Sequence, residues 1–107
     1  MKFALTIFPA AEADVDAAAR FIAQDNLPAA LRFYDCVDAT FTQIRDYPMR
    51  SPRYELEEPR LAHLRKRSVM KFPNYLTFYR IEEREIQIIR VLHGARDIPA
   101  ILWDELT

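Results

Sequence analysis

The segment from residue 61 to residue 97 constrains the fold most, because its pattern predicts three consecutive β-strands. Runs rich in Val, Ile, Phe and Tyr alternate with two expected turns, one at residues 72–74 and one at residues 82–85. Strands joined by such short reversals pair antiparallel, so the segment predicts a meander. Its first strand is crowded with cations, namely Arg65, Lys66, Arg67 and Lys71. We therefore expect the open face of the sheet to be basic.

Two amphipathic helices precede the meander. The apolar stripe of the first consists of Val15, Ala18, Ala19 and Ile22. The stripe of the second, which begins near Pro28, consists of Ala30, Phe33, Tyr34, Val37, Phe41 and Ile44. About three residues join the helices, so they form an antiparallel hairpin. Their shared apolar face requires a sheet to cover it.

The remaining segments complete one domain over residues 1–107. Residues 3–8 predict a first strand that Pro9 ends, and the proline-rich stretch 48–60 predicts a loop. A short helix is expected to start near Pro99, with Asp97 as its cap, and to dock on the core. The predicted order is β-α-α-β-β-β-α, an α+β fold in which a small antiparallel sheet packs against a helical hairpin.

Composition excludes several classes of protein. No apolar run approaches the roughly 18 residues that span a bilayer, and the N-terminus lacks a signal-peptide pattern, so we expect a cytoplasmic protein without a membrane partner. Cys36 is the only cysteine, which argues against a disulfide framework or a metal site. Gly94 is the only glycine, which excludes a glycine-rich phosphate loop. No cofactor is expected.

Charge is distributed unevenly although the net charge is only -1. Residues 48–96 carry eleven Lys and Arg against six Asp and Glu, a local net charge of +5. Residues 1–47 and 97–107 each have a net charge of -3. The basic middle of the chain is therefore expected to attract an acidic partner.

Two segments carry a family resemblance. Residues 11–37, AEADVDAAARFIAQDNLPAALRFYDCV, and residues 64–98, LRKRSVMKFPNYLTFYRIEEREIQIIRVLHGARDI, resemble the RelE/ParE superfamily of type II toxins, with the ParE branch most similar. The most specific parts are FPNYLTFYRI and IIRVLHGARDI. The resemblance implies a small bacterial toxin in a toxin-antitoxin hetero-oligomer. It also implies a cognate antitoxin that wraps an extended C-terminal segment over the sheet and helices.

The superfamily contains two activities, and the resemblance implies one of them. RelE-like members cut messenger RNA on the ribosome, whereas ParE-like members act on DNA gyrase without such chemistry. RelE-like nucleases carry an arginine where this chain has Leu76, and a basic residue where it has Gly94. A protein that docks on ribosomal RNA is also usually strongly basic, which this chain is not. The sequence thus favours a gyrase-binding toxin that is not an enzyme.

Two alternatives remain open. One is a ribosome-dependent endoribonuclease that would use the cations Arg65, Arg67 and Arg96 for phosphate charge and His93 for proton transfer. The other is an inactive member that serves only to bind the antitoxin. A structural role for His93, satisfying a backbone group at a strand end, is favoured over a general base.

The candidate residues for binding the antitoxin or the target are Arg65, Arg67, Arg90, Arg96 and Trp103. Each has a structural alternative: a solvated edge for the first pair, a partly buried ion pair for Arg90, a helix cap for Arg96 and docking of the last helix for Trp103. The aromatic residues Tyr75, Phe78 and Tyr79 could stack on bases, but their spacing favours core packing.

Overall fold

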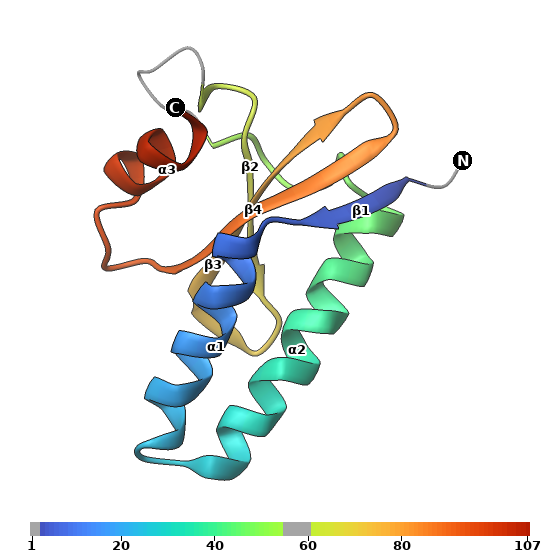
Figure 1. Cartoon of the computed structure of the whole chain (residues 1–107). Coiled ribbons are helices and arrows are strands. Elements are labelled where there is room, and N and C mark those ends of the chain that lie inside the picture. Colours follow the sequence, from blue (N-terminus) through green and yellow to red (C-terminus); the bar gives the residue numbers. More distant parts are fainter. Residues whose placement is uncertain (1–2, 55–60) are drawn as a thin grey trace.

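The computed structural model describes residues 3–54 and 61–107, and it has the predicted order of elements. Residues 55–60 of the predicted loop lie outside the described residues. The elements are β1 (Ala4–Ile7), α1 (Pro9–Ala23), α2 (Leu27–Asp46), β2 (Arg65–Val69), β3 (Phe72–Glu82), β4 (Glu85–His93) and α3 (Ile98–Leu106). The predicted α+β fold is confirmed (Figure 1).

The four strands form one sheet in the order β1-β4-β3-β2. The meander β2-β3-β4 is antiparallel as expected, but β1 pairs parallel to β4, so the sheet is mixed. This parallel pairing arises because the chain makes a crossover through the helical hairpin between β1 and the meander. The sequence pattern contained no signal for the partner of β1.

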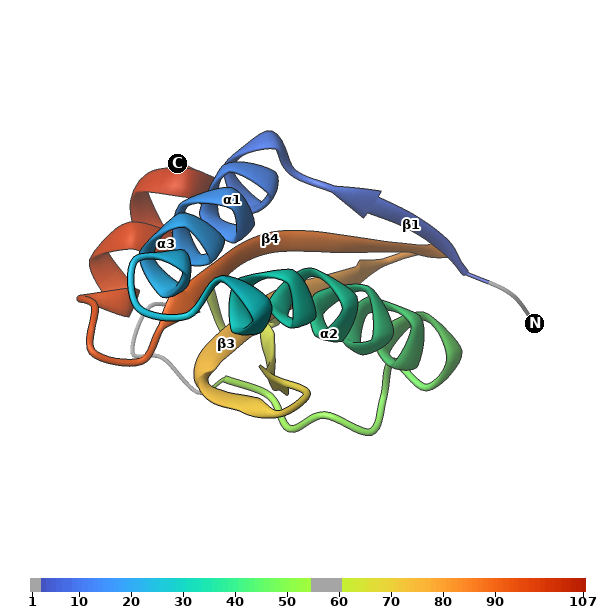
Figure 2. The ribbon, with the colours of Figure 1, turned by 90° about the horizontal axis from the view of Figure 1, so that it is seen from below.

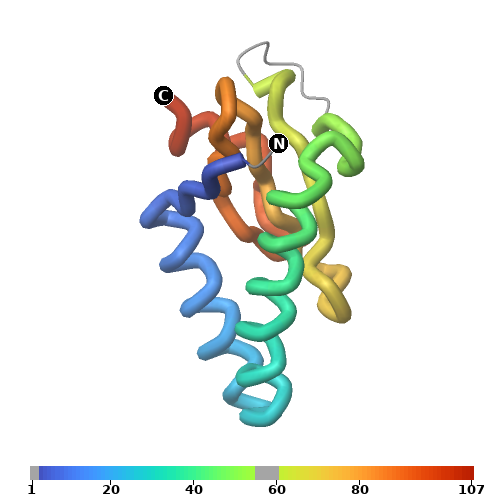
Figure 3. The backbone as a smooth tube through the Cα atoms, turned by 90° about the vertical axis from the view of Figure 1, so that its right-hand side faces the viewer, coloured from blue at the N-terminus to red at the C-terminus, as the bar shows by residue number. Residues whose placement is uncertain are grey.

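The helical hairpin covers one face of the sheet, and its tip projects away from the strands (Figures 1 and 3). Each helix has a proline in its first turn, where the missing N–H is not needed. The side chain of Asn26 caps α2 by accepting a hydrogen bond from the Ala29 N–H at 3.0 Å. The buried stripes include Val15 and Ala18 on α1, and Phe33 and Phe41 on α2, as predicted.

The opposite face of the sheet is also covered, so the expected open basic face is wrong. Leu61 and Leu64 pack there with Phe78 of β3, Leu92 of β4 and Leu102 of α3. Figure 2 shows α3 beside β4, apart from α2. This second cluster confirms that the last helix docks on the core. Asp97 stands at the N-cap position of α3, but its side chain makes no capping hydrogen bond.

The predicted turn at residues 72–74 is also wrong, because the chain reverses at Met70 and Lys71 instead. Lys71 adopts a positive φ of 64°. Phe72 begins β3 and packs edge-on against Phe33, with ring centroids 5.1 Å apart. The register between β2 and β3 is irregular beside Phe72. Pro73, which has no backbone N–H, therefore lies where the sheet requires no hydrogen-bond donor. Burial of an aromatic side chain outweighed the turn signal of Pro73-Asn74.

An irregularity in the β3-β4 pairing changes which face the later side chains of β4 reach. Phe78 pairs with Arg90 and Tyr79 with Ile88, so Ile89 is the extra residue of a bulge. Ile88 packs under the hairpin and Ile89 in the cluster under α3, as in a regular strand, but Val91 packs under the hairpin although it is two residues after Ile89. Both faces of β4 are therefore apolar at this point.

Arg90, which follows the bulge, ties α1 and α3 to β4. Its Nε and Nη2 atoms donate to the two carboxylate oxygens of Asp14 at 2.6 and 2.7 Å, and its Nη1 lies 3.6 Å from Glu105. The Val91 N–H donates to the same carboxylate at 3.0 Å. Both side chains of the pair are more than four-fifths buried, and the hydrogen bond to Asp14 raises the pKa of Arg90 against the effect of its burial.

We expect Asp14→Asn to lower the free energy of unfolding by about 2 to 4 kcal/mol, because Arg90 would keep its charge in a buried place with a weaker partner. Urea unfolding followed by circular dichroism measures the change. Asp38→Asn, an exposed carboxylate on α2, is the matched control and should change stability by less than about 0.5 kcal/mol. Equal effects of the two substitutions would contradict the anchoring role of Asp14.

Tyr79→Phe should lower stability by about 1 kcal/mol at neutral pH, since the buried Tyr79 hydroxyl donates to the Pro48 carbonyl at 2.7 Å. Burial raises the pKa of Tyr79 above its ordinary value, although Arg65 and Arg67 oppose the rise. The fold therefore favours the neutral phenol.

The sign of the pH dependence follows from this shift. The contribution of neutral Tyr79 is complete below the unfolded pKa of about 10 and is lost as pH rises through the higher folded pKa. The stability of Tyr79→Phe should therefore fall less steeply above pH 10 than that of the parent protein. Tyr47→Phe, at a ring that is 55% exposed, serves as the control and should match the parent curve.

Candidate functional site

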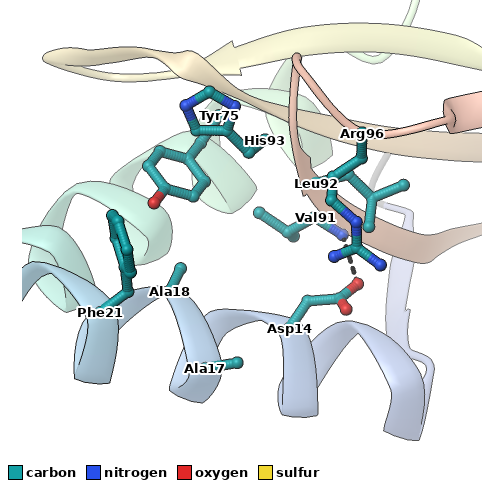
Figure 4. Close-up of a pocket in the computed structure, with 9 residues that line it drawn as sticks. All are labelled: Asp14, Ala17, Ala18, Phe21, Tyr75, Val91, Leu92, His93 and Arg96. Carbon is teal, nitrogen blue, oxygen red and sulfur yellow. Dashed lines mark hydrogen bonds between the residues drawn. The ribbon is translucent and has the colours of Figure 1, made fainter.

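A pocket of about 370 Å³ lies between α1 and the end of β4 (Figure 4). We call it the α1-β4 pocket. It is lined by Asp14, Ala17, Ala18, Phe21, Tyr75, Val91, Leu92, His93 and Arg96. In Figure 4, Ala17, Ala18 and Phe21 extend from α1, while Tyr75 and His93 lie across the cavity from them. The pocket thus has an apolar helical wall opposite a polar wall.

The helical wall is apolar because α1 presents small residues there. Ala18 is buried, and Ala17 is exposed at the rim. Phe21 stands one turn further along, and it is 63% exposed. Val91 and Leu92 supply further apolar lining from β4. A large apolar side chain is therefore left in contact with water at the edge of this pocket.

The polar wall contains His93, whose hydrogen bonding defines its tautomer. The Ala95 N–H donates to His93 Nδ1 at 3.0 Å, so the neutral imidazole carries its proton on Nε2. The ring also packs edge-on against Tyr75, with centroids 5.1 Å apart. The structural role predicted for His93 at a strand end is thus confirmed, and its Nε2–H remains a donor.

Tyr75 supplies a second donor to the polar wall, whereas Arg96 lies beside Asp14 and Val91 in Figure 4, apart from Tyr75 and His93. Burial raises the pKa of Tyr75, which favours the neutral phenol, and its hydroxyl points toward α1 in Figure 4. Arg96 lies in the turn between β4 and α3, exposed, and its guanidinium is permanently charged. Among the described residues, no hydrogen bond from the side chain of either residue was found.

Arg65 and Arg67 lie elsewhere, on the edge strand β2. Arg65 Nη1 donates to the Ser51 carbonyl at 2.6 Å, and Arg67 Nη2 donates to Gln43 Oε1 of α2 at 2.7 Å. Both guanidinium groups therefore hold the loop and α2 against the sheet. Lys66 points to the other face, where its ammonium lies 5.6 Å from the Tyr54 ring centroid.

The other predicted residues have structural contacts as well. Arg90 makes the partly buried ion pair with Asp14 that was one of its two expected roles. Trp103 packs against the second cluster from α3, as the docking alternative predicted. Tyr79 is fully buried under the hairpin, and Phe78 is fully buried on the opposite face, which confirms core packing for these aromatics.

The sequence interpretation missed Asp14 and Phe21. Asp14 was assigned only to the charge of the helix terminus, yet it lies between the buried Ala11 and Ala18 at helical spacing. A carboxylate within an apolar stripe was the available signal for a buried partner. Phe21 is not part of the predicted stripe of Val15, Ala18, Ala19 and Ile22, and nothing in the pattern indicated that it lies beside a pocket.

No group of three or more potential metal ligands occurs among the described residues. Within residues 3–54 and 61–107, no helix is long and apolar enough to cross a membrane.

Comparisons with known proteins agree on the fold. The structure resembles one described as the chromosomal ParDE toxin-antitoxin system from P. aeruginosa, with a TM-score of 0.71 and 19% identity over 86% of this chain and 96% of that chain. It also resembles a chain of the RelBE2 toxin-antitoxin complex from Mycobacterium tuberculosis, with a TM-score of 0.54 and 21% identity over 87% and 99% of the two chains. No curated protein sequence matches significantly.

The family is established by sequence. The sequence model described as the ParE toxin of the type II toxin-antitoxin system parDE matches residues 5–98, from β1 to the first residue of α3. This range includes the helical hairpin, the whole meander and all nine residues of the α1-β4 pocket. The chain therefore belongs to the ParE toxin family of type II toxin-antitoxin systems.

Proposed function

We propose that this toxin acts by binding DNA gyrase, without an active site of its own, and that a cognate antitoxin neutralises it by covering its surface. The proposal rests on the family match and on one observation in the structure. Two of the three cations that the nuclease alternative requires, Arg65 and Arg67, are engaged in structural contacts away from His93. The strand register determines how far these cations lie from His93.

The strand register separates Arg65 and Arg67 from His93. Arg67 pairs with Thr77 on β3, while His93 pairs with Tyr75, two residues further along and one strand further across. With strands about 4.8 Å apart and a rise of about 3.3 Å per residue, the two Cα atoms are about 12 Å apart. Arg65 is two residues more distant. Arg65 and Arg67 are thus not placed next to His93.

Leu76 supports the same conclusion. Its side chain packs against the second apolar cluster, so the position at which nucleases of the superfamily carry an arginine contributes to the core here. Gly94, just after β4, has no side chain, and its N–H donates to the Asn74 carbonyl at 2.8 Å. These two positions supply neither charge nor a donor side chain for phosphate chemistry.

An antitoxin partner is supported by the kind of structure that this chain resembles, because both similar structures are described as toxin-antitoxin systems or complexes. The hairpin also exposes large apolar side chains. Phe21, Leu27 and Leu31 are 60% exposed or more, near the hairpin tip. Apolar groups gathered on one surface are typical of a protein-binding region. We therefore place partner contacts on the hairpin as well as on the sheet edge.

Purified toxin, freed of antitoxin, should inhibit supercoiling by DNA gyrase and trap double-strand breaks. Gel electrophoresis of a relaxed plasmid incubated with gyrase and ATP measures both effects. Adding the cognate antitoxin should restore supercoiling and remove the breaks. Intact supercoiling at toxin concentrations that arrest growth, together with cleavage of messenger RNA on purified ribosomes, would overturn the proposal in favour of the nuclease.

His93→Ala separates binding from chemistry in the same assay. If His93 only contacts a partner, we expect the toxin concentration for half-maximal inhibition to rise while complete inhibition is still reached at saturation. A catalytic His93 would instead leave saturating toxin inactive, which would contradict the proposal. His63→Ala, at an exposed histidine distant in sequence from the pocket, is the matched control and should leave the curve unchanged.

A further inference from the structure

We propose that the free edge of β1 binds an extended, basic segment of a partner protein, which adds a strand to the four-stranded sheet. Lys or Arg side chains of that strand would lie in a groove beside β1 and reach the carboxylates at its rim. The inference rests on the proposed function in one respect, since it takes the toxin to work through protein contacts. The charge of this partner is opposite to that of the acidic partner expected for the basic middle of the chain.

The two edges of the sheet differ in how they are protected. Residues 52–54 run along the β2 edge, where the Tyr54 N–H donates to the Leu64 carbonyl at 2.6 Å and the Lys66 N–H donates to the Pro52 carbonyl at 3.1 Å. β2 also begins with three consecutive cations. Coverage and charge are two ways in which proteins prevent an edge strand from pairing with another chain. β1, which forms the other edge, contains no charged residue.

The outer backbone groups of β1 are available for pairing. Ala4 and Phe8 donate their N–H groups toward β4, at 2.9 Å in both cases. Because successive residues of a strand direct these groups to opposite sides, the N–H and carbonyl groups of Leu5 and Ile7 point away from β4. Among the described residues, none of these four groups has a hydrogen-bond partner. Donors and acceptors that repeat about every 7 Å match the backbone of an extended polypeptide.

A groove of about 300 Å³ lies on the hairpin side of this edge, between β1, α1 and α2. Its apolar lining consists of Ile7, Val15, Val37 and Phe41. Leu5 and Ile7 both pack against the cluster under the hairpin, so they face the same side of the sheet as the groove. Every second side chain of an added strand would point to this side. The groove therefore receives side chains of the added strand.

The rim of the groove is acidic. Glu12, Asp16 and Asp38 line it, and all three are exposed. Asp16 accepts a hydrogen bond from the Tyr34 hydroxyl at 2.8 Å, which leaves its charge in place. In the described part of the chain, no cation forms an ion pair with any of the three carboxylates. Lys and Arg combine an aliphatic stem with a cationic end, so they suit an apolar lining with an acidic rim.

The same charges argue against a second copy of this chain as the added strand. The β1 strand of a second copy would contribute no cation, because β1 has no charged residue. It would also bring a second set of the same carboxylates to the interface, and like charges placed opposite one another disfavour association. A basic segment of another protein therefore fits this edge better.

The test is a titration of ¹⁵N-labelled toxin, free of antitoxin, with the peptide acetyl-Thr-Arg-Thr-Val-Thr-Arg-Thr-amide. At saturation, amide hydrogen exchange of Leu5 and Ile7 should slow at least roughly tenfold, because their N–H groups gain acceptors. Exchange of Phe8 should change less, since its N–H already bonds to the Ile88 carbonyl.

Modified peptides test the charge and the strand separately. A peptide with Glu in place of both Arg residues should bind at least roughly tenfold more weakly, because the rim would repel it. Successive N–H groups of a strand point to opposite sides. Methylating the backbone nitrogen of the central Val or that of the following Thr should therefore block binding in one case and preserve it in the other.

Variants of the toxin locate the binding. The double variant Glu12→Gln, Asp38→Asn should weaken binding of the Arg peptide roughly tenfold by removing two charges from the rim. Asp104→Asn, at an exposed carboxylate of α3 outside the groove, is the matched control and should leave the affinity unchanged. Dispersed amide spectra confirm that each variant is folded.

Several outcomes would overturn this inference. They are unchanged exchange at Leu5 and Ile7, equal binding of the Arg and Glu peptides, equal effects of the two methylations, and equal binding by the double variant and the parent. Sedimentation of the toxin alone as a dimer in which Leu5 and Ile7 are protected would assign the edge to a second copy instead.

The titration contains neither gyrase nor antitoxin, so its result is independent of the proposed target. A toxin that binds the Arg peptide but does not inhibit gyrase would keep the β1 site and contradict the gyrase proposal. A toxin that inhibits gyrase but does not bind the peptide would do the reverse.

Discussion

The buried ion pair between Asp14 and Arg90 is the interaction on which the arrangement of this toxin depends. It joins α1 to the central strand β4, and Glu105 extends it to α3, so helices from both ends of the chain are held by one guanidinium. Taking two charges out of water is costly, and the bidentate geometry and the additional Val91 N–H compensate for that cost. The pair therefore specifies how α1 sits on the sheet, and with it the shape of the α1-β4 pocket.

The β-bulge makes this arrangement possible. By adding one residue at Ile89, it shifts the alternation of the later part of β4, so that Val91 packs under the hairpin and Leu92 packs in the cluster under α3. In a regular strand Val91 would share the face of Ile89, and Leu92 would share the face of Ile88. The sheet is a central layer between two apolar clusters.

The small size of the domain also explains where the arginines lie. In a domain of 107 residues, a large share of the long cationic side chains lie near the boundary of a core, where they bind carbonyls, carboxylates and amides. Arg65, Arg67 and Arg90 stabilise the fold in this way. Arg96 differs because it lies in an exposed turn. This division is consistent with a toxin that acts by contact.

The sequence alone determined the order of elements, the helical hairpin and the docking of the last helix, because periodic burial and proline positions are local signals. The resemblance of two segments also sufficed to identify the superfamily, which the family match confirmed.

Only the tertiary structure decided which side chains meet. The parallel partner of β1, the turn at Lys71, the covered second face and the pairing of Asp14 with Arg90 join residues up to 76 positions apart. The β-bulge shifts the register by one residue, and such a shift changes which face each side chain reaches. Contacts of this kind depend on packing across the whole domain, so no local pattern in the sequence specifies them.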